Sequence, residues 1–271
     1  MNTVIPLPYL TVFRVRGPDA ATFLHGQMAA DLENLDEGDA TFSAYCSPRG
    51  QVIAMLLIQR TGNDWLLAGH SELMEPVIER LRRFVLRADV QFEAETGSLA
   101  GVPKPGKARG TVTPGGTGLH YVFGNNSAAA PETAVSDWRW RELEQGVSWL
   151  GPASSERFIP QMIGLDRIGA VSFSKGCFPG QEVIARARYL GKVKRGPVLV
   201  AFRGLSDLAV GDDVSLTADD QSADGVVVEL VRRADDAVLV VVVSSLDESA
   251  PVRRIEHRGE NAQADRIQRL D

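Results

Sequence analysis

The octet Lys175 to Glu182 reads Lys-Gly-Cys-Phe-Pro-Gly-Gln-Glu and concentrates an amine, a thiol, an amide and a carboxylate in one short stretch. A proline and a glycine after the cysteine indicate a turn, and residues 181 to 190 carry apolar side chains at near-helical spacing. Cys177 is therefore expected just before a helix N-terminus with Lys175 close by, and both neighbours favour the thiolate. Thiolate is the nucleophilic and metal-binding form of cysteine. The alternative is a packed thiol in a glycine-rich turn, since free cysteine is often buried.

Two roles are open for the octet. In the functional one, Cys177 is a nucleophile or a transient carrier of sulfur or of a one-carbon unit, Lys175 favours its thiolate, and Gln181 and Glu182 position a substrate. In the structural one, the glycines make a tight turn, and Glu182 stabilises the first turn of the following helix through the helix dipole. The two roles are compatible with each other.

The octet resembles the signature of the YgfZ family, which are folate-binding proteins connected with iron–sulfur cluster assembly or repair. Members of this family are structural relatives of the glycine-cleavage T-protein, an aminomethyltransferase. The similarity continues in four shorter segments on either side of the octet: Gly26-Gln27, residues 45 to 50 (YCSPRG), residues 158 to 161 (FIPQ) and residues 185 to 188 (ARAR). The resemblance implies a bound tetrahydrofolate or related reduced folate, and iron–sulfur client proteins as partners.

The resemblance also implies where the folate binds. Trp138 precedes a Glu-x-Gly turn that begins at Glu144, and the family's tryptophan at that place contacts folate. A pterin ring needs a stacking face and an acceptor for its paired donors, which Trp138 and Glu144 would supply. Leu10 stands where some family members have a second aromatic residue, so stacking there is weaker. Phe178-Pro179 replaces the Tyr-Thr common in the family, which removes hydroxyl groups from the octet. Without the resemblance, core packing is the alternative for Trp138.

A basic run follows the octet, although the net charge of the whole chain is −6. A negative net charge argues against direct nucleic-acid binding over a broad surface. Cations near a helix C-terminus are favoured by its dipole, which is the structural interpretation of the run. The run also suits a small polyanion such as the polyglutamate tail of a folate, for which Arg188 is a candidate ligand, and RNA ranks behind both. Its members, with Tyr189 among them, are Arg186, Arg188, Lys192, Lys194 and Arg195.

Composition limits the remaining possibilities. The chain has only two cysteines, Cys46 and Cys177, which argues against a disulfide framework but leaves open a single disulfide between them. Its four histidines show no metal-ligand spacing, so no metal site is predicted and any link to iron–sulfur chemistry is indirect. The N-terminus lacks the pattern of a signal peptide, and the longest apolar run, residues 237 to 243, is too short for a membrane helix. We therefore expect a soluble cytoplasmic protein with no membrane segment.

The pattern along the chain predicts an α+β protein followed by a small β-barrel or sandwich. By resemblance this is an aminomethyltransferase-like fold, in which two α+β domains interlock around a central folate channel. The expected domains are 1–102, 103–195 with the octet, a barrel at 196–255, and a charged tail at 256–271. Residues 103 to 118 are rich in glycine and proline and mark a seam, 128–134 reads as a linker, and 138–144 is helical or extended. Helices are expected at 19–30, 71–87 and 181–190, and strands at 10–15, 40–46, 51–58, 64–67, 90–92, 119–123, 198–202, 213–216, 225–230 and 238–243.

Three functions compete on these residues. The first is a folate-binding accessory protein that supports iron–sulfur cluster assembly or repair, and thereby iron–sulfur enzymes including tRNA-modifying ones. The second is an aminomethyltransferase of the T-protein type, which the sequence supports little because residues 68–72 (AGHSE) stand where a Gly-Tyr-Thr-Gly-Glu-Asp-like segment is expected. The third is a non-catalytic protein- or RNA-binding module, since fold does not imply function. Whether any reaction occurs stays open; an enzymatic role would be a one-carbon or sulfur transfer through Cys177.

Overall fold

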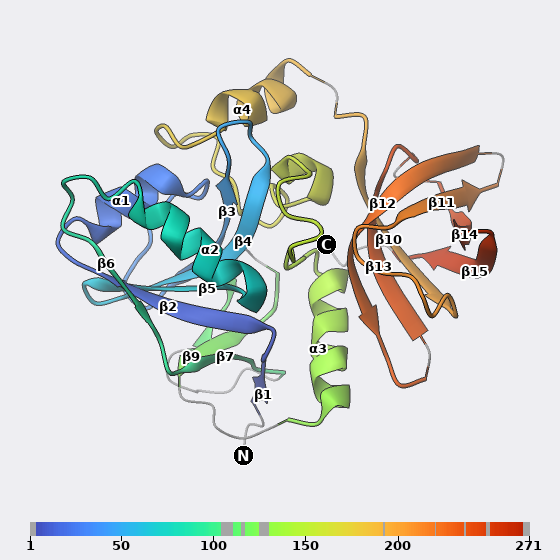
Figure 1. Ribbon diagram of the computed structural model, residues 1–271, viewed down its shortest axis with the longest axis horizontal. Coiled ribbons are helices and arrows are strands. Elements are labelled where there is room, and N and C mark those ends of the chain that lie inside the picture. The colour runs from blue at the N-terminus through green and yellow to red at the C-terminus, as the bar shows by residue number, and fades with distance from the viewer. Residues whose placement is uncertain are drawn as a thin grey trace.

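Strands dominate the computed structural model, which describes residues 4–103, 111–114, 117–124, 130–191, 193–219, 221–235, 237–247 and 250–267. In these residues the strands form a five-stranded sheet, a four-stranded sheet and a closed barrel, with α3 between the sheets and the barrel (Figure 1). The predicted α+β architecture with a C-terminal barrel is confirmed. None of the helices in the described part of the chain is long and apolar enough to cross a membrane.

The five-stranded sheet is antiparallel, and its most buried strand is β4, where eight consecutive residues from Val52 are buried. A strand buried on both faces needs cover on both sides, which gives it a continuous apolar sequence. The strands predicted at 40–46 and 51–58 are present and form a hairpin, in whose turn the Gly50 amide donates to the Ser47 carbonyl and Gly50 has a φ of 76°. In spatial order the strands are β3 (Ala40–Cys46), β4 (Val52–Thr61), β5 (Asp64–His70), β2 (Leu10–Arg16) and β6 (Gln91–Ala94).

Two helices belong to this first sheet, α1 (Ala20–Gln27) and α2 (Ser71–Arg82). The buried side of α2 comes from Leu73, Met74, Val77, Ile78 and Leu81. The helix ends five residues before its predicted end at 87, although Val85 beyond it still packs against the core. Beyond its end, Phe84 and Leu86 are exposed.

The four-stranded sheet joins the start of the chain to a later part. In spatial order its strands are β1 (Ile5–Pro6), β7 (Ser98–Gly101), β9 (Tyr121–Gly124) and β8 (Thr111–Val112). The pairing of β1 with β7 ties the N-terminus into this second sheet. Helix α3 (Glu132–Glu144) follows and includes 132–134, so that part of the predicted linker is helical. Much of the predicted seam at 103–118, namely 104–110 and 115–116, lies outside the described residues.

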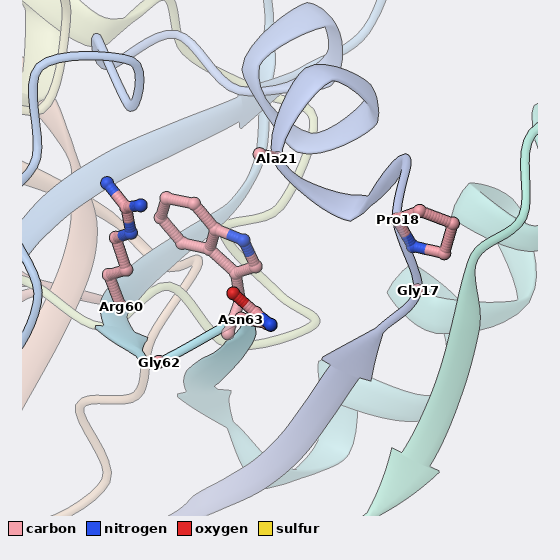
Figure 2. Close-up of a pocket in the computed structure, with 7 residues that line it drawn as sticks. Gly17, Pro18, Ala21, Arg60, Gly62 and Asn63 are labelled. Carbon is pink, nitrogen blue, oxygen red and sulfur yellow. The ribbon is translucent and has the colours of Figure 1, made fainter.

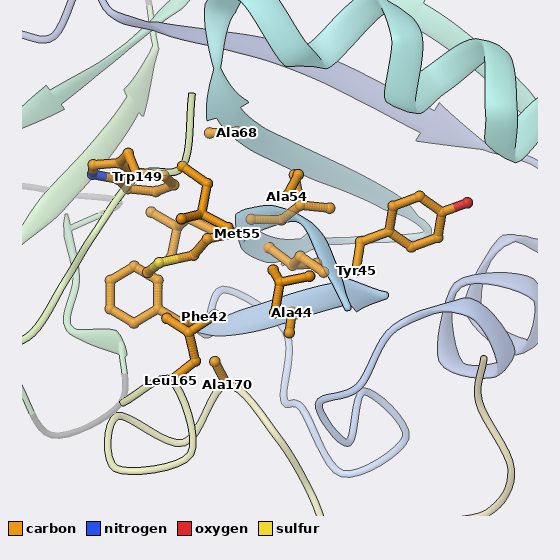
Figure 3. Close-up of a cluster of buried hydrophobic side chains, with 14 of the residues drawn as sticks. Phe42, Ala44, Tyr45, Ala54, Met55, Ala68, Trp149, Leu165 and Ala170 are labelled. Carbon is orange, nitrogen blue, oxygen red and sulfur yellow. The ribbon is translucent and has the colours of Figure 1, made fainter. Parts of the chain in front are cut away.

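A shared apolar core locks the two sheet regions together. Phe42 from β3 packs edge-on against Trp149, which follows α3, with ring centroids 6.0 Å apart. Figure 3 shows Met55 of β4 beside these rings, with Leu165 and Ala170 from the later segment beneath Phe42. All five of these side chains are buried. Residues from both halves of the N-terminal region therefore build one core.

The C-terminal barrel is closed by a strand that the sequence had indicated as a charged tail. Residues 256–271 were expected to be a tail, but β15 (Glu260–Arg266) pairs with both β14 and β10. The apolar pattern of this strand is weak in the sequence, because the residues that pack into the barrel core are the small Ala262 and Ala264 and their neighbours are polar or charged. Closure leaves no unpaired edge. Around the barrel the strands run β10 (Gly196–Arg203), β13 (Ala237–Ser244), β12 (Gln221–Arg232), β11 (Asp213–Ala218), β14 (Val252–His257) and β15.

Candidate functional site

The octet lies at the end of a segment that is held against the edge of the first sheet. The Ala44 amide of β3 donates to the Ala170 carbonyl at 2.9 Å, and the Ser172 amide donates to the Ala29 carbonyl at 2.8 Å. The chain then turns into α4 (Gln181–Tyr189), which lies over the tip of the β3–β4 hairpin (Figure 1). The helix predicted at 181–190 is confirmed.

Two glycines allow the hairpin and the octet to touch. Gly180 has a φ of 80°, and a Cβ atom built on it would lie 2.5 Å from the Ser47 carbonyl oxygen. Gly50, at the hairpin turn, would place a Cβ 3.0 Å from the Cβ of Val183. Only glycine fits such a contact, because any side chain would collide with backbone atoms. Two segments that are far apart in the sequence, YCSPRG and the octet, therefore form one surface.

Lys175 anchors the octet to the residues that follow α1. Its side chain is buried, and its Nζ donates to the Met28 carbonyl at 2.7 Å, to the Ala30 carbonyl at 3.2 Å and to the His25 carbonyl. Burial lowers the pKa of Lys175 to about 8. These bonds point the ammonium at backbone carbonyls, and no hydrogen bond among the described residues joins it to the Cys177 thiol. Lys175 thus attaches the octet to the end of α1, through carbonyls that lie on either side of the Gly26-Gln27 pair.

The two cysteines lie in opposite environments. Cys177 is exposed and free, whereas Cys46 on β3 is buried and free. Burial raises the pKa of Cys46 to about 12, so this thiol stays protonated and shielded. The chain therefore presents one thiol to solvent, and it is the thiol of the octet.

Amide side chains hold the loop around Cys177 without touching the thiol itself. Gln181 Nε2 donates to the Lys175 carbonyl at 3.4 Å and to the Gly176 carbonyl at 3.3 Å. Gln161, from the FIPQ segment, donates to the Ile184 carbonyl at 2.8 Å. Glu182 is exposed in the first turn of α4, with no side-chain capping bond there. Gln181 and Gln161 therefore fix the backbone, and Glu182 stays available at the surface.

Arg188 lies on an aromatic face. Its guanidinium carbon is 4.2 Å from the ring centroid of Phe173 and 6.0 Å from that of Tyr189. These rings meet edge to face with their centroids 6.2 Å apart. Arg188 and Tyr189 nevertheless remain exposed, so the second arginine of the basic run is held in place by aromatic contacts. Lys192 of that run lies outside the described residues.

Trp138 lies in a different part of the molecule, where it is only 1% exposed. Its ring contacts Gly101 so closely that a Cβ there would lie 2.3 Å from a ring carbon. Tyr121 meets it edge-on with centroids 5.6 Å apart, and the exposed Arg141 lies over it at 5.3 Å. Leu10 is also buried and pairs with His70 between β2 and β5. No hydrogen bond, ion pair or ring contact between described residues joins Trp138 to the octet.

The sequence did not single out Glu142, although it is the central acceptor around Trp138. Its carboxylate accepts from Tyr9 at 2.7 Å, Tyr121 at 2.8 Å, Trp138 at 3.1 Å and Trp149 at 3.1 Å. Burial raises the pKa of Glu142, and these donors oppose that effect. The available signal was the helical spacing of Trp138 and Glu142, which places them on one face.

Glu144, which was predicted as a folate ligand from the sequence, has fewer hydrogen-bond partners than Glu142. Its Oε1 accepts from Trp140 Nε1 at 3.0 Å, and its side chain is half-buried. Trp140 and Glu144 therefore repeat the tryptophan–carboxylate pairing of Trp138 and Glu142 two residues further along α3. The pairing engages one of the two carboxylate oxygens of Glu144.

Two cavities lie away from both groups of residues. One, of about 530 Å³, lies beside the β4–β5 turn, where Arg60 and Asn63 face Pro18 and Ala21 (Figure 2). Another, of about 400 Å³, is lined by residues that include Arg14 and Phe123. Neither is lined by a residue that the sequence predicted for the site.

Comparisons with known proteins agree with the resemblance that the octet carries. The proteins named "tRNA-modifying protein YgfZ" from Blochmanniella pennsylvanica and from Escherichia coli strain SE11 are each 25% identical to the chain, over 286 and 280 residues. These matches cover 89% and 90% of this chain and 86% of each relative. The chain is thus similar to YgfZ proteins along most of its length. The YgfZ protein of Colwellia psychrerythraea is 27% identical over 224 residues, which are 71% of this chain and 69% of that protein. No family model matches.

The fold has a solved counterpart. The crystal structure of the glycine cleavage system aminomethyltransferase T from Bartonella henselae matches with a TM-score of 0.69 and 16% identity. The match covers 98% of this chain and 85% of that protein. The aminomethyltransferase-like fold implied by the YgfZ resemblance is confirmed, and at this identity the likeness concerns the fold alone.

Proposed function

We propose that the protein is a cytoplasmic folate-binding accessory factor that supports iron–sulfur cluster assembly or repair, and through it iron–sulfur enzymes including tRNA-modifying ones. The observation that carries the proposal is the exposed thiol of Cys177 on a loop whose other polar side chains hold it in place. The side chains of Lys175 and Gln181 donate to backbone carbonyls, which fixes the loop and leaves the thiol accessible. A fixed, accessible thiol suits transient carriage of a sulfur or one-carbon group.

Tetrahydrofolate or a related reduced folate is the proposed ligand of the cluster around Trp138. The donor set fits a pterin, because planar aromatic rings surround a buried carboxylate that can accept from ring N–H groups. The structure also leaves the Arg139 Nε, Ser148 Oγ and Glu229 Oε2 atoms buried without a hydrogen-bond partner. The Trp138 ring is covered on one side by the exposed Arg141, which can swing into solvent. Trp138 would stack on the pterin there, with Glu142 or Glu144 accepting from its donors and Leu10 packing nearby.

Titration with tetrahydrofolate, followed by calorimetry, tests the ligand. We expect saturable binding that weakens at least tenfold in Trp138→Ala, because the stacking face is lost. Trp65→Ala is the matched control, since Trp65 is equally buried but lines the separate 530 Å³ cavity. Absence of saturable binding at high micromolar folate would contradict the proposal.

The role of the thiol is tested in cells. In a bacterial strain that lacks its own YgfZ protein, the wild-type chain is expected to restore iron–sulfur-dependent tRNA modification. Cys177→Ala should abolish this rescue while its thermal unfolding and folate affinity stay unchanged, because the side chain is exposed and forms no disulfide. Cys46→Ala serves as the control for loss of a thiol, and rescue by Cys177→Ala would remove the thiol from the mechanism.

A true aminomethyltransferase is the second candidate, and the likeness in fold to the Bartonella protein favours testing it. Residues 68–72, which depart from the transferase pattern, span the end of β5 and the start of α2. Methylene transfer from an aminomethylated lipoyl carrier to tetrahydrofolate is the direct assay. Robust turnover would place this function first.

A further inference from the structure

Large apolar side chains are exposed on α4. Val183 is 42% exposed, Tyr189 65% and Leu190, the residue that ends the helix, 84%. Among the described residues, the other large apolar side chains this exposed are Phe84 and Leu86 near the end of α2. Contiguous exposed apolar surface is unfavourable in water unless a partner covers it. The α4 group lies directly after the exposed thiol of the octet.

Two of these exposed apolar residues lie on one side of the helix. Val183, Arg186 and Leu190 are three and four positions apart, so they form a stripe along one face. Ile184 points the other way and is buried. Val183 of the stripe rests against Gly50, and Tyr189, which lies beside the stripe, meets the ring of Phe173 edge to face. Ordered contact residues lose little conformational freedom on binding.

Positive charge surrounds the stripe. Arg49 at the hairpin tip, Arg186 and Arg188 are all exposed, and the acidic residue on α4 is Glu182. This local excess of cations stands on a chain whose net charge is −6. A complementary partner would combine carboxylates with apolar side chains.

We infer that this face of α4 docks an acidic amphipathic segment of a client protein, next to the exposed thiol of Cys177. The inference rests on the proposed role of the thiol, since a client must come close to it for transfer. A protein segment fits better than RNA, because Val183 and Leu190 gain by burial against apolar side chains and have nothing to gain against phosphates. Tyr189 is the aromatic side chain of α4 that could stack on a base.

The test uses the full chain and synthetic probes. A fluorescein-labelled amphipathic peptide with leucines on one face and glutamates on the other is compared with its lysine counterpart and with a single-stranded RNA of similar length. Fluorescence anisotropy is expected to report saturable binding of the acidic peptide only, with affinity that falls as salt is raised. Binding of the RNA in preference to the acidic peptide, or no binding of either, would overturn the inference.

Two variants locate the binding site. Leu190→Glu should weaken binding of the acidic peptide at least tenfold, because it removes apolar contact and adds repulsion. Leu86→Glu is the matched control, since Leu86 is 87% exposed on a different element, and it should bind as the wild type does. Arg186→Gln should reduce both the affinity and its salt dependence. Equal loss in the Leu190 and Leu86 variants would contradict a site on α4.

Separate readouts distinguish this inference from the proposed function. Cys177→Ala should bind the acidic peptide normally, because the thiol is not part of the stripe. Leu190→Glu should bind tetrahydrofolate normally, yet lose the rescue of tRNA modification in cells. If tetrahydrofolate fails to bind while the acidic peptide still docks on α4, the folate proposal fails and the docking surface stands. If Leu190→Glu rescues fully, the docking surface fails and the role of Cys177 stands.

Discussion

The two glycines inside the octet differ in how much the structure depends on them, and substituting each with alanine tests this difference. Gly180→Ala is expected to destabilise the protein by about 1–3 kcal/mol, because alanine is strained at positive φ and its Cβ would meet the Ser47 carbonyl oxygen. Gly176→Ala should be nearly neutral, since a Cβ there meets nothing within 4 Å. Chemical denaturation measures both. A Gly180→Ala protein as stable as the wild type would show that the hairpin contact contributes little.

Thiol accessibility gives a second test at single residues. A thiol reagent such as Ellman's reagent should react quickly with one cysteine per native chain and with the second only after unfolding. The reason is that Cys177 is exposed, whereas Cys46 is buried and its pKa is raised to about 12. Cys177→Ala should remove the fast reaction entirely. Fast reaction of two thiols in the native protein would mean that β3 opens readily.

At the level of elements, Glu142 makes α3 the point where several parts of the chain meet. Its four donors come from residues on different segments: Tyr9 before β2, Tyr121 on β9, Trp138 on α3 and Trp149 beyond it. Buried networks of this kind stabilise only when every member has its partner. The Glu142 carboxylate therefore has a structural role: it orders the region around Trp138. This role is compatible with binding a ligand there.

Glu142→Leu is therefore expected to lower the free energy of unfolding by about 2–5 kcal/mol, because it leaves several buried donors without an acceptor at about 1–3 kcal/mol each before relaxation. Glu144→Leu is the control, since Glu144 is half-buried and accepts one bond, and its cost should stay below about 1.5 kcal/mol. Urea denaturation of both proteins measures the difference. Equal costs would mean that the four donors find other partners.

Much of the element pattern could be predicted from the sequence, and the failures have physical causes. The strand at 40–46 and the helix at 181–190 were predictable because their apolar spacing and flanking turn residues agree. Strand β15 was not, because alanines carry its inward face and closure of a barrel is a long-range property. Glu142 was missed for a related reason: Tyr9 and Tyr121, two of its four donors, are distant in sequence, and the helical spacing from Trp138 does not by itself mark an acceptor. The octet was found because its members are adjacent.

At the scale of the whole molecule, the barrel is joined to the N-terminal region through α3. Arg139 of α3 pairs with the buried Glu229 of β12 at 3.1 Å. Arg233, just beyond β12, pairs with Asp137 at 2.8 Å and lies 4.0 Å from the ring centroid of Trp140. Removing one member of a buried ion pair is costly because it leaves the other charge uncompensated. Ion pairs thus set how the barrel sits against α3.

This interface should respond to pH through Glu229. Burial is the main cause that raises the pKa of Glu229 to about 7, with Glu142 adding to the effect and Arg139 opposing it. In the unfolded chain a glutamate titrates near about 4.3, so between that value and about 7 the folded state holds a proton that the unfolded state has released. The free energy of unfolding should therefore fall as pH rises through this window. Glu229→Gln, which cannot ionise, should flatten this slope in thermal unfolding measured at intervals from pH 5 to pH 7.5, whereas the exposed Asp137→Asn should keep it. An unchanged slope in Glu229→Gln would mean that the barrel interface does not hold this proton.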